Sequence, residues 1–265
     1  MQNMLTVMGI TIAAMSVWML LLWLLSVARH DASIVDIFWG LSFILIGAIG
    51  CGVGHGFPAR KALIGTLTAI WGLRLAIHIF VRNRGKGEDF RYRAMRKRYG
   101  ARFPIASLFV VFGLQGLLAW IISAPLQAAT SSPEPSHLTA LDFVGAAIWA
   151  VGFLFESVGD WQLARFKSNP SNKGKVMDQG LWKYTRHPNY FGDALLWWGF
   201  FLIAACTAGT AGLFTAVGPA LMTFLLMKIS GAALLEKTLV KTKPEYRDYI
   251  ARTGAFFPWP PKRAL

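Results

Sequence analysis

The stretch that decides the fold runs from residue 165 to residue 193. It begins with Arg-Phe-Lys-Ser-Asn-Pro (165–170) and, after a short polar bridge, continues with Gly-Leu-Trp-Lys-Tyr-Thr-Arg-His-Pro-Asn-Tyr-Phe-Gly-Asp (180–193), before a run of Leu, Trp and Phe. A basic loop therefore leads into an apolar helix. Pro188 fits the first turn of that helix, because its fixed φ suits a helix start and its missing N–H is not needed there.

Polar groups mark the mouth of this helix. Asn189 and Asp193 are four residues apart and share one helix face, and Glu156 and Asp160, just before the basic loop, repeat the spacing. The cations of the loop are Arg165, Lys167, Lys173, Lys175, Lys183 and Arg186. Together these groups predict a site for an anionic, polar cofactor, although a positively charged membrane anchor with an ordinary helix cap is the alternative. Acids inside membrane spans are costly, which favours the functional reading of Asn189 with Asp193.

The composition is that of a polytopic membrane protein. Of 265 residues, 55% are hydrophobic and 15% are charged, and the mean hydropathy is +0.46. The net charge is +14. Because the cations lie between apolar runs, membrane orientation explains most of them, and nucleic-acid binding is not expected. Cys51 and Cys206 have no metal-ligand spacing and form no disulfide framework, so no metal site is predicted.

Seven apolar runs are long enough to cross a bilayer, since a span needs about 20 residues. They cover residues 4–28, 34–54, 62–81, 104–128, 140–159, 189–208 and 211–235. No internal repeat or domain linker separates them. The sequence therefore predicts an all-α fold, with seven transmembrane helices in one membrane-embedded domain over residues 1–265.

The charges between the spans orient this bundle. The segments rich in Lys and Arg are residues 82–103, residues 160–188 and the tail after residue 236. Residues 129–139 and 209–210 contain neither. Because positive loops face the cytoplasm, the N-terminus is predicted outside and the C-terminus in the cytoplasm. Arg60 with Lys61 is a local exception, which this orientation places outside.

Polar side chains also lie inside the second and third predicted spans. Asp36, in the first turn of the second span, either complements the helix dipole or is an acid that desolvation keeps protonated as a donor. In the third span, Arg74, His78 and Arg82 repeat every four residues and form one polar stripe. Arg74 lies about two turns deeper than Arg82, so it needs either a salt bridge, to Glu156 or Asp36, or a ligand.

A second basic segment follows the third span. Residues 82–92 read Arg-Asn-Arg-Gly-Lys-Gly-Glu-Asp-Phe-Arg-Tyr, in which the glycines allow backbone N–H groups to approach a ligand closely. Arg84 and Lys86 can bind phosphate, and Glu88 or Asp89 can accept from a ribose or an amide. The sequence has neither a Rossmann fingerprint nor a P-loop, so the helices and their loops must bind any nucleotide.

Three motifs resemble the bacterial membrane family related to steroid 5-alpha-reductases. They are the Asn-Arg-Gly segment at 83–92, the Arg-His-Pro-Asn-Tyr segment at 180–193, and Leu-Leu-Glu-Lys-Thr with the later Pro-Glu-Tyr-Arg-Asp-Tyr at 234–249. The resemblance extends from about Asp31 to the C-terminus. Arg-His-Pro-Asn-Tyr by itself also resembles isoprenylcysteine carboxyl methyltransferases and related phospholipid methyltransferases, which use S-adenosylmethionine.

The resemblance implies a seven-helix reductase of the bacterial inner membrane, which binds NADPH from the cytoplasmic side. It implies hydride transfer to the carbon–carbon double bond of an α,β-unsaturated ketone in a steroid-like, membrane-dissolved substrate. Asp36 would then hold the substrate carbonyl, together with His78 or Arg74, because the third span has no Tyr. The predicted cofactor-binding residues are Asn83, Arg84, Lys86, Glu88, Asp89, Arg91, Tyr92, Glu156, Asp160, Arg165, Lys167, Asn169, Lys175, Tyr184, Arg186, His187, Asn189, Tyr190, Asp193 and Glu236. Glu236 takes the place of a His in the family.

Two other classes of protein stay open. A membrane methyltransferase that uses S-adenosylmethionine would account for Arg-His-Pro-Asn-Tyr and the Glu- and Tyr-rich tail, but not for the basic motif at 83–92. A sterol- or lipid-binding protein without enzymatic activity, or a transporter, would need only the apolar bundle. Transport is disfavoured, because no pair of Gly- or Pro-broken spans recurs in corresponding halves.

Overall fold

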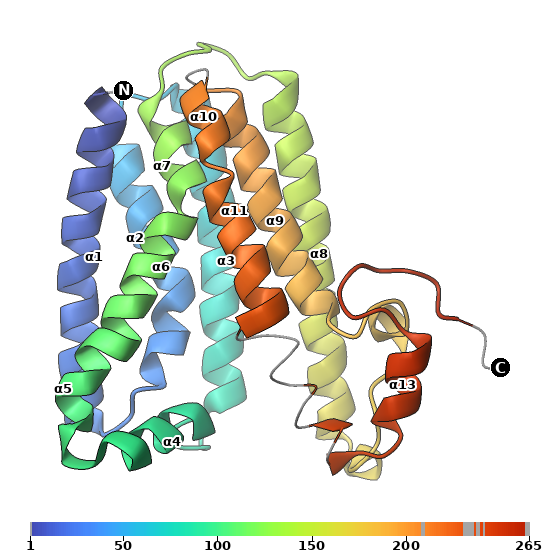
Figure 1. Ribbon diagram of the computed structural model, residues 1–265. Coiled ribbons are helices and arrows are strands. Elements are labelled where there is room, and N and C mark those ends of the chain that lie inside the picture. The colour runs from blue at the N-terminus through green and yellow to red at the C-terminus, as the bar shows by residue number, and fades with distance from the viewer. Residues whose placement is uncertain (1, 208–209, 230–235, 237–238, 241, 263–265) are drawn as a thin grey trace. The chain divides into compact units, whose positions relative to one another are not determined.

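The protein is helical throughout the part that the structure describes. The computed structural model describes residues 2–207, 210–229, 236, 239–240 and 242–262, and no strand occurs within these ranges. The ribbon in Figure 1 follows the helices from the N-terminus to the short helix near the C-terminus. The all-α prediction is therefore confirmed.

Six helical segments of the described chain are long and apolar enough to cross a membrane. They are Gln2–Arg29 (α1), Ile34–Val53 (α2), Pro58–Asn83 (α3), Phe90–Ile122, Ala140–Ser168 (α8) and Gly212–Ile229. The predicted count of seven is not confirmed. The predicted sixth span forms α9 (Pro188–Ala205), which is not one of the six, because polar residues such as Asn189 and Asp193 interrupt its apolar run. The orientation of the termini stays a prediction.

The chain divides into two compact units, residues 1–142 with 203–217 and residues 143–202 with 218–265. In the first unit, α2 packs against both α1 and α3. Glycines allow the close approach of α2 and α3, since a Cβ on Gly72 would lie only 2.6 Å from the carbonyl oxygen of Gly40. Thr11 of α1 donates to Gln127 of α7 (Ala124–Ser131) over 3.0 Å.

The predicted basic loop 82–103 contains a helix, α4 (Phe90–Tyr99), which lies across one end of α1 to α3 (Figure 1). The prediction of a loop rested on the polar composition of the segment. The helix forms because Asp89 caps it, accepting the backbone N–H of Arg91 over 2.9 Å. Most residues that follow have good helix propensity.

The predicted fourth span, residues 104–128, is also interrupted. It consists of α5 (Phe103–Ser107), a π-helical turn over Leu108–Gly113 and α6 (Leu114–Ile122). The helix stops at Ser123, and α7 begins with Pro125 in its first turn. Proline has no N–H for the preceding turn and its ring clashes with that turn, so it starts a new helix here.

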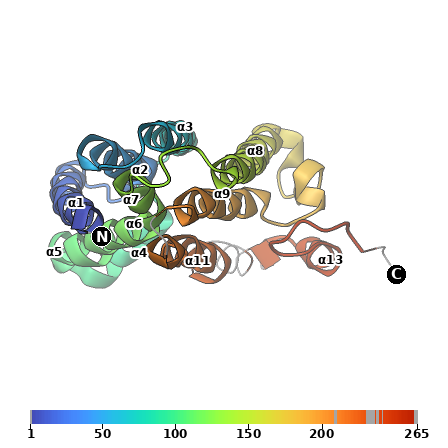
Figure 2. The ribbon, with the colours of Figure 1, turned by 90° about the horizontal axis from the view of Figure 1, so that it is seen from above.

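In the second unit, α8 and α9 lie side by side (Figure 2) and touch through glycines. A Cβ on Gly152 would lie 2.6 Å from the carbonyl oxygen of Gly192, and a Cβ on Gly199 would lie 2.7 Å from the backbone nitrogen of Trp149. α8 continues to Ser168, beyond the predicted end at residue 159, because no helix breaker occurs before Pro170. The predicted loop residues Arg165 and Lys167 are therefore on the helix.

Further short helices complete the two units. They are α10 (Thr210–Phe214) in the first unit, and α11 (Val217–Phe224) and α13 (Tyr246–Arg252), which lie almost wholly in the second. The indole of Trp198 on α9 donates to Thr223 on α11 over 3.2 Å. This bond joins the two apolar helices within the second unit.

Candidate functional site

Each unit contains a polar cluster that includes predicted site residues. In the first unit the cluster surrounds Asp36, at the start of α2. Its carboxylate accepts from Nη2 of Arg91 over 2.6 Å and from the hydroxyl of Tyr92 over 2.7 Å. Gln115, on α6, donates to the same hydroxyl over 3.1 Å. Asp36 is thus an acceptor in this structure, and Tyr92 is the donor that contacts it.

Two further acids support the turn that leads into α4. Glu88 accepts from the Arg96 guanidinium over 2.8 and 3.0 Å and from the backbone N–H of Ala32 over 2.9 Å. Burial alone would raise the pKa of Glu88, but these hydrogen bonds outweigh burial and hold the pKa below its usual value. The pKa of Asp89 is lowered in the same way: burial opposes the shift, and hydrogen bonds from Arg91 dominate.

A small pocket opens beside this turn. Its volume is about 180 Å³. It is lined by Asn83, Lys86, Gly87, Glu88, Asp89, Phe90 and Arg93. Gly85 and Gly87 have φ angles of +76° and +68°, which favour glycine. Because Glu88 and Asp89 are already paired with arginines, the exposed cations Lys86 and Arg93 give the pocket a positive character suited to a phosphate.

The other two predicted catalytic residues, Arg74 and His78, lie half-buried on α3, also in the first unit. They are four residues apart, as the predicted polar stripe requires. Arg84 is exposed at the C-terminal cap of α3. The Asp36 carboxylate is bound by Arg91 and Tyr92, a pairing that sequence analysis missed.

In the second unit, the cluster lies where α8 and α9 cross. Glu156 and Asp160 are buried, with exposed fractions of 3% and 8%. Asn189 donates its Nδ2 to Asp160 over 2.9 Å, and its Oδ1 has no hydrogen-bond partner among the residues described. Asp193 is half-buried on the next turn of α9. The amide nitrogen of Asn189 is therefore held by Asp160, and its buried oxygen can accept a hydrogen bond from a ligand.

Arg186, His187 and Glu236 form an internal ion-pair cluster. Arg186 contacts both carboxylate oxygens of Glu236, over 2.8 and 3.1 Å, and His187 Nε2 lies 2.9 Å from the same carboxylate. Burial would raise the pKa of Glu236, but the hydrogen bonds from His187 and Arg186 lower it to about 2. The ring of Tyr190 stacks on His187 at 5.4 Å. Arg186 and His187 are therefore both bound to the Glu236 carboxylate within the protein.

The C-terminal segment fixes the loop that carries this cluster. The backbone N–H of Arg186 donates to Gly254 over 2.9 Å, and the hydroxyl of Thr185 donates to Phe256 over 2.8 Å. The hydroxyl of Tyr249 donates to the carbonyl of Trp182, and burial raises its pKa. The motifs at 180–193 and 234–249 thus contact each other. This contact was not predicted from the sequence, although the presence of both motifs in one chain was a signal.

The remaining predicted cofactor residues lie on the surface of the second unit. Arg165 lies 5.5 Å from the ring of Trp161, and Lys167 is exposed near the end of α8. Asn169 caps the following turn by accepting from Ser171 over 3.0 Å. Lys175 and Tyr184 are also exposed, and their carbonyl groups accept from Lys243 and Trp259. All five residues are exposed, in contrast to the buried Glu156 and Asp160.

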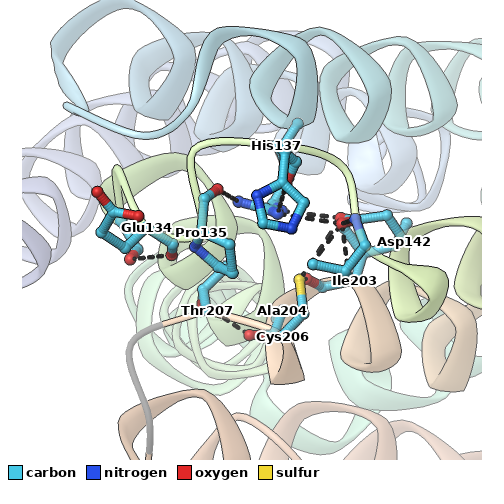
Figure 3. Close-up of polar contacts among 11 residues, drawn as sticks. Glu134, Pro135, His137, Asp142, Ile203, Ala204, Cys206 and Thr207 are labelled. Atoms are coloured by element: carbon cyan, nitrogen blue, oxygen red, sulfur yellow. Dashed lines mark hydrogen bonds and ion pairs between the residues drawn. The ribbon is translucent and has the colours of Figure 1, made fainter.

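A third polar cluster, which sequence analysis missed, belongs to the first unit (Figure 3). Arg60 and Asp142 are fully buried and form a two-bond ion pair of 2.8 and 3.0 Å. Arg60 also donates to the carbonyls of Pro135 and His137 over 3.1 and 2.8 Å. Cys206 Sγ lies 3.5 Å from the Asp142 carboxylate oxygens. Arg60, which departs from the predicted charge distribution between the two sides of the membrane, is therefore part of a structural ion pair.

The family model described as "Protein of unknown function (DUF1295)" matches residues 22–253. The chain belongs to this family. An uncharacterized protein of Schizosaccharomyces pombe is 24% identical over 262 residues, which cover 89% of this chain and 75% of that protein. A probable O-methyltransferase of Ustilaginoidea virens is 48% identical over 46 residues, 17% of this chain and 16% of that protein. No solved structure shows significant similarity to the chain.

Proposed function

We propose that this member of the DUF1295 family is an NADPH-dependent reductase of the carbon–carbon double bond in a membrane-dissolved, steroid-like α,β-unsaturated ketone. The observation that carries the proposal is Asn189, whose amide is held by Asp160 and whose Oδ1 is buried without a partner among the described residues. A carboxamide N–H or a ribose hydroxyl of a nucleotide is a matching donor. We further propose that the cofactor site at the start of α9 faces the cytoplasm.

Taken by itself, the first unit also has a feature that suits a phosphate-bearing ligand. The pocket beside α4 has cations suited to a phosphate, namely Lys86 and Arg93. NADPH, when bound, would supply the hydride. Tyr92 is the donor that we propose for the charge developing on the substrate carbonyl: its single O–H, which donates to Asp36 in this structure, would turn to the substrate oxygen, while Gln115 still donates to the phenol oxygen. One well-placed donor of this kind contributes roughly 3–4 kcal/mol to transition-state stabilisation.

The assignment to Tyr92 modifies the role predicted for Asp36. Arg91 and Tyr92 both donate to the Asp36 carboxylate, so Asp36 serves best as an acceptor that orients the phenol. Tyr92 also fills the role for which the third span offered no tyrosine. We keep Arg74 and His78 as proposed substrate contacts of the same unit.

A methyltransferase is the second candidate function. The local match to a probable O-methyltransferase favours it. Glu156 and Asp160 also favour it, because two buried carboxylates suit the cationic groups of S-adenosylmethionine better than the phosphates of NADPH. The basic pocket beside α4 favours the reductase, because its cations suit the phosphates of NADPH.

Cofactor identity separates the two candidates. Thermal unfolding of the detergent-purified protein is measured with NADPH, NADH and S-adenosylmethionine, for the wild type and for Asn189→Leu. Stabilisation of the wild type by NADPH alone, lost in Asn189→Leu, is the expected result. Stabilisation by S-adenosylmethionine alone would replace the reductase with the methyltransferase. A response to NADPH that survives in Asn189→Leu would move the cofactor away from α9.

A further inference from the structure

The arginines on the inner side of α4 are neutralised within the first unit. Arg91 pairs with Asp36 over 2.6 Å. Arg96 pairs with Glu88 over 2.8 Å, and its guanidinium lies 4.4 Å from the centre of the Phe103 ring, at the start of α5. These contacts attach α4 to the unit and hold its C-terminal end beside α5.

Three further cations lie near the end of α4 and are exposed. They are Lys97, Arg98 and Arg102. Arg98 lies over the ring of Tyr99 at 5.9 Å, but no acid of the described ranges forms an ion pair with any of the three. Like charges within six residues repel one another, so a bound anion would stabilise this end of α4.

The chain turns at Gly100, between α4 and the segment that follows. Its φ of +54° is an angle that glycine adopts readily. Because of this turn, α4 lies across the end of α1 to α3, whereas α6 runs alongside α1 (Figure 1). Since α1 to α3 are candidate membrane spans, the turn lies at the level of the membrane surface, where lipid headgroups are found.

Exposed apolar side chains follow these cations directly. Ile105 and Phe109 are 68% and 67% exposed, and they belong to a segment that is itself a candidate span. Arg102, Ile105 and Phe109 are spaced by three and four residues, so they follow one face of the helical segment. A cation at the membrane surface with apolar side chains below it matches a phospholipid, whose phosphate lies above its acyl chains.

We propose that Lys97, Arg98 and Arg102 bind the headgroup of an anionic phospholipid, whose acyl chains lie against Ile105 and Phe109. A zwitterionic headgroup carries its own cation beside the phosphate, whereas an anionic one, such as that of phosphatidylglycerol, leaves its charge for the protein. None of the three cations lines the pocket beside α4. The lipid site is therefore additional to the proposed cofactor site and does not depend on the reductase assignment.

The test measures lipid binding to the full-length protein in a neutral detergent by native mass spectrometry. Phosphatidylglycerol and phosphatidylcholine with identical acyl chains are titrated separately. Each cation near an anionic headgroup strengthens binding about fivefold, so the wild type is expected to prefer phosphatidylglycerol roughly 100-fold. The triple variant Lys97→Gln, Arg98→Gln and Arg102→Gln is expected to lose this preference. Arg102→Gln alone is expected to lower it about fivefold.

A matched variant separates this site from general attraction between a basic protein and an anionic lipid. It carries Lys183→Gln, Arg247→Gln and Lys262→Gln, which remove three exposed cations of the second unit. Its net charge equals that of the first triple variant, and it is expected to keep the wild-type preference. All six side chains are exposed, so both variants are expected to fold, which their unfolding temperatures without added lipid check.

Two further measurements distinguish a lipid from a soluble phosphate compound. Glycerophosphoglycerol, which is the headgroup without acyl chains, is expected to displace little phosphatidylglycerol at equal concentration. Ile105→Ala combined with Phe109→Ala is expected to weaken both lipids and to leave the preference unchanged, because apolar contact is lost with either lipid. The inference is overturned if the wild type shows no preference, if the first triple variant retains it or the matched variant loses it equally, if glycerophosphoglycerol displaces the lipid, or if the two alanines leave both affinities unchanged.

Discussion

The ion pair between Arg60 and Asp142 gives the sharpest prediction about stability. Both side chains have exposed fractions of 0%, and the arginine makes four hydrogen bonds, two to the carboxylate and two to backbone carbonyls. Removing one member of such a pair leaves a buried charge uncompensated, which costs about 3–5 kcal/mol. For a chain of this size, each kcal/mol lowers the Tm by roughly 2–4 °C. Arg60→Met is therefore expected to lower the Tm by about 10 °C.

The experiment is a double-mutant cycle with Arg60→Met, Asp142→Leu and the combination of both. Unfolding is followed by tryptophan fluorescence in detergent at one fixed heating rate, because membrane proteins often unfold irreversibly. The double variant should recover most of the loss, since an apolar pair replaces a buried ion pair at little cost. Arg252→Met is the control, because its pair with Asp178 is exposed (43% and 38%) and its loss should change the Tm by at most about 4 °C. Additive losses in the double variant would refute the reasoning.

Three further predictions follow from the other contacts. Replacing Tyr92 by Phe should lower the kcat of NADPH-dependent enone reduction about 100-fold while leaving the Kd for NADPH unchanged, and an unaltered kcat in a stopped-flow assay would exclude the phenol as donor. Because the pKa of Glu236 is lowered to about 2 from 4.5, its ion pair contributes about 3 kcal/mol above pH 4.5 and loses it as the pH falls toward 2. Glu236→Gln should therefore be less stable at neutral pH and should lose less stability on acidification than the wild type in denaturant titrations. Gly199→Ala should destabilise the fold by about 1–3 kcal/mol, since its Cβ would meet the carbonyl oxygen of Gly145 at 2.6 Å, whereas Gly9→Ala meets nothing within 4 Å and should be neutral or stabilising.

The sequence was informative where the signal is local. Apolar runs predicted the helices of the membrane domain, because lipid requires every backbone group to be paired within a helix. Pro188 correctly predicted the start of α9, the helix that contains Asn189 and Asp193. The break at Ser123 was also foreseeable, because Pro125 cannot continue a helix, yet a hydropathy window averages over such a residue.

The pairing of distant residues was not foreseeable from one sequence. Asp36 contacts Tyr92 across 56 positions, and Arg186 contacts Glu236 across 50, so only the packed fold brings them together. Charge alone could not distinguish Arg186, which is used internally, from Lys86, which lines a pocket. The same limit hid Arg60, whose partner Asp142 lies 82 positions away.

The contacts between the C-terminal segment and the loop at 180–187 have a consequence for biosynthesis. A ribosome makes this loop long before its partners, since Arg186 and Thr253 are 67 positions apart. A nascent chain can thus insert α8 and α9 while the loop still lacks Tyr249, Gly254 and Phe256. Asn189 itself does not wait for them, since Asp160 of α8, which holds its amide, is made earlier. The loop at 180–187 is therefore the part of this unit that is fixed last, and in an unfinished chain it lacks the contacts that hold Thr185 and Arg186.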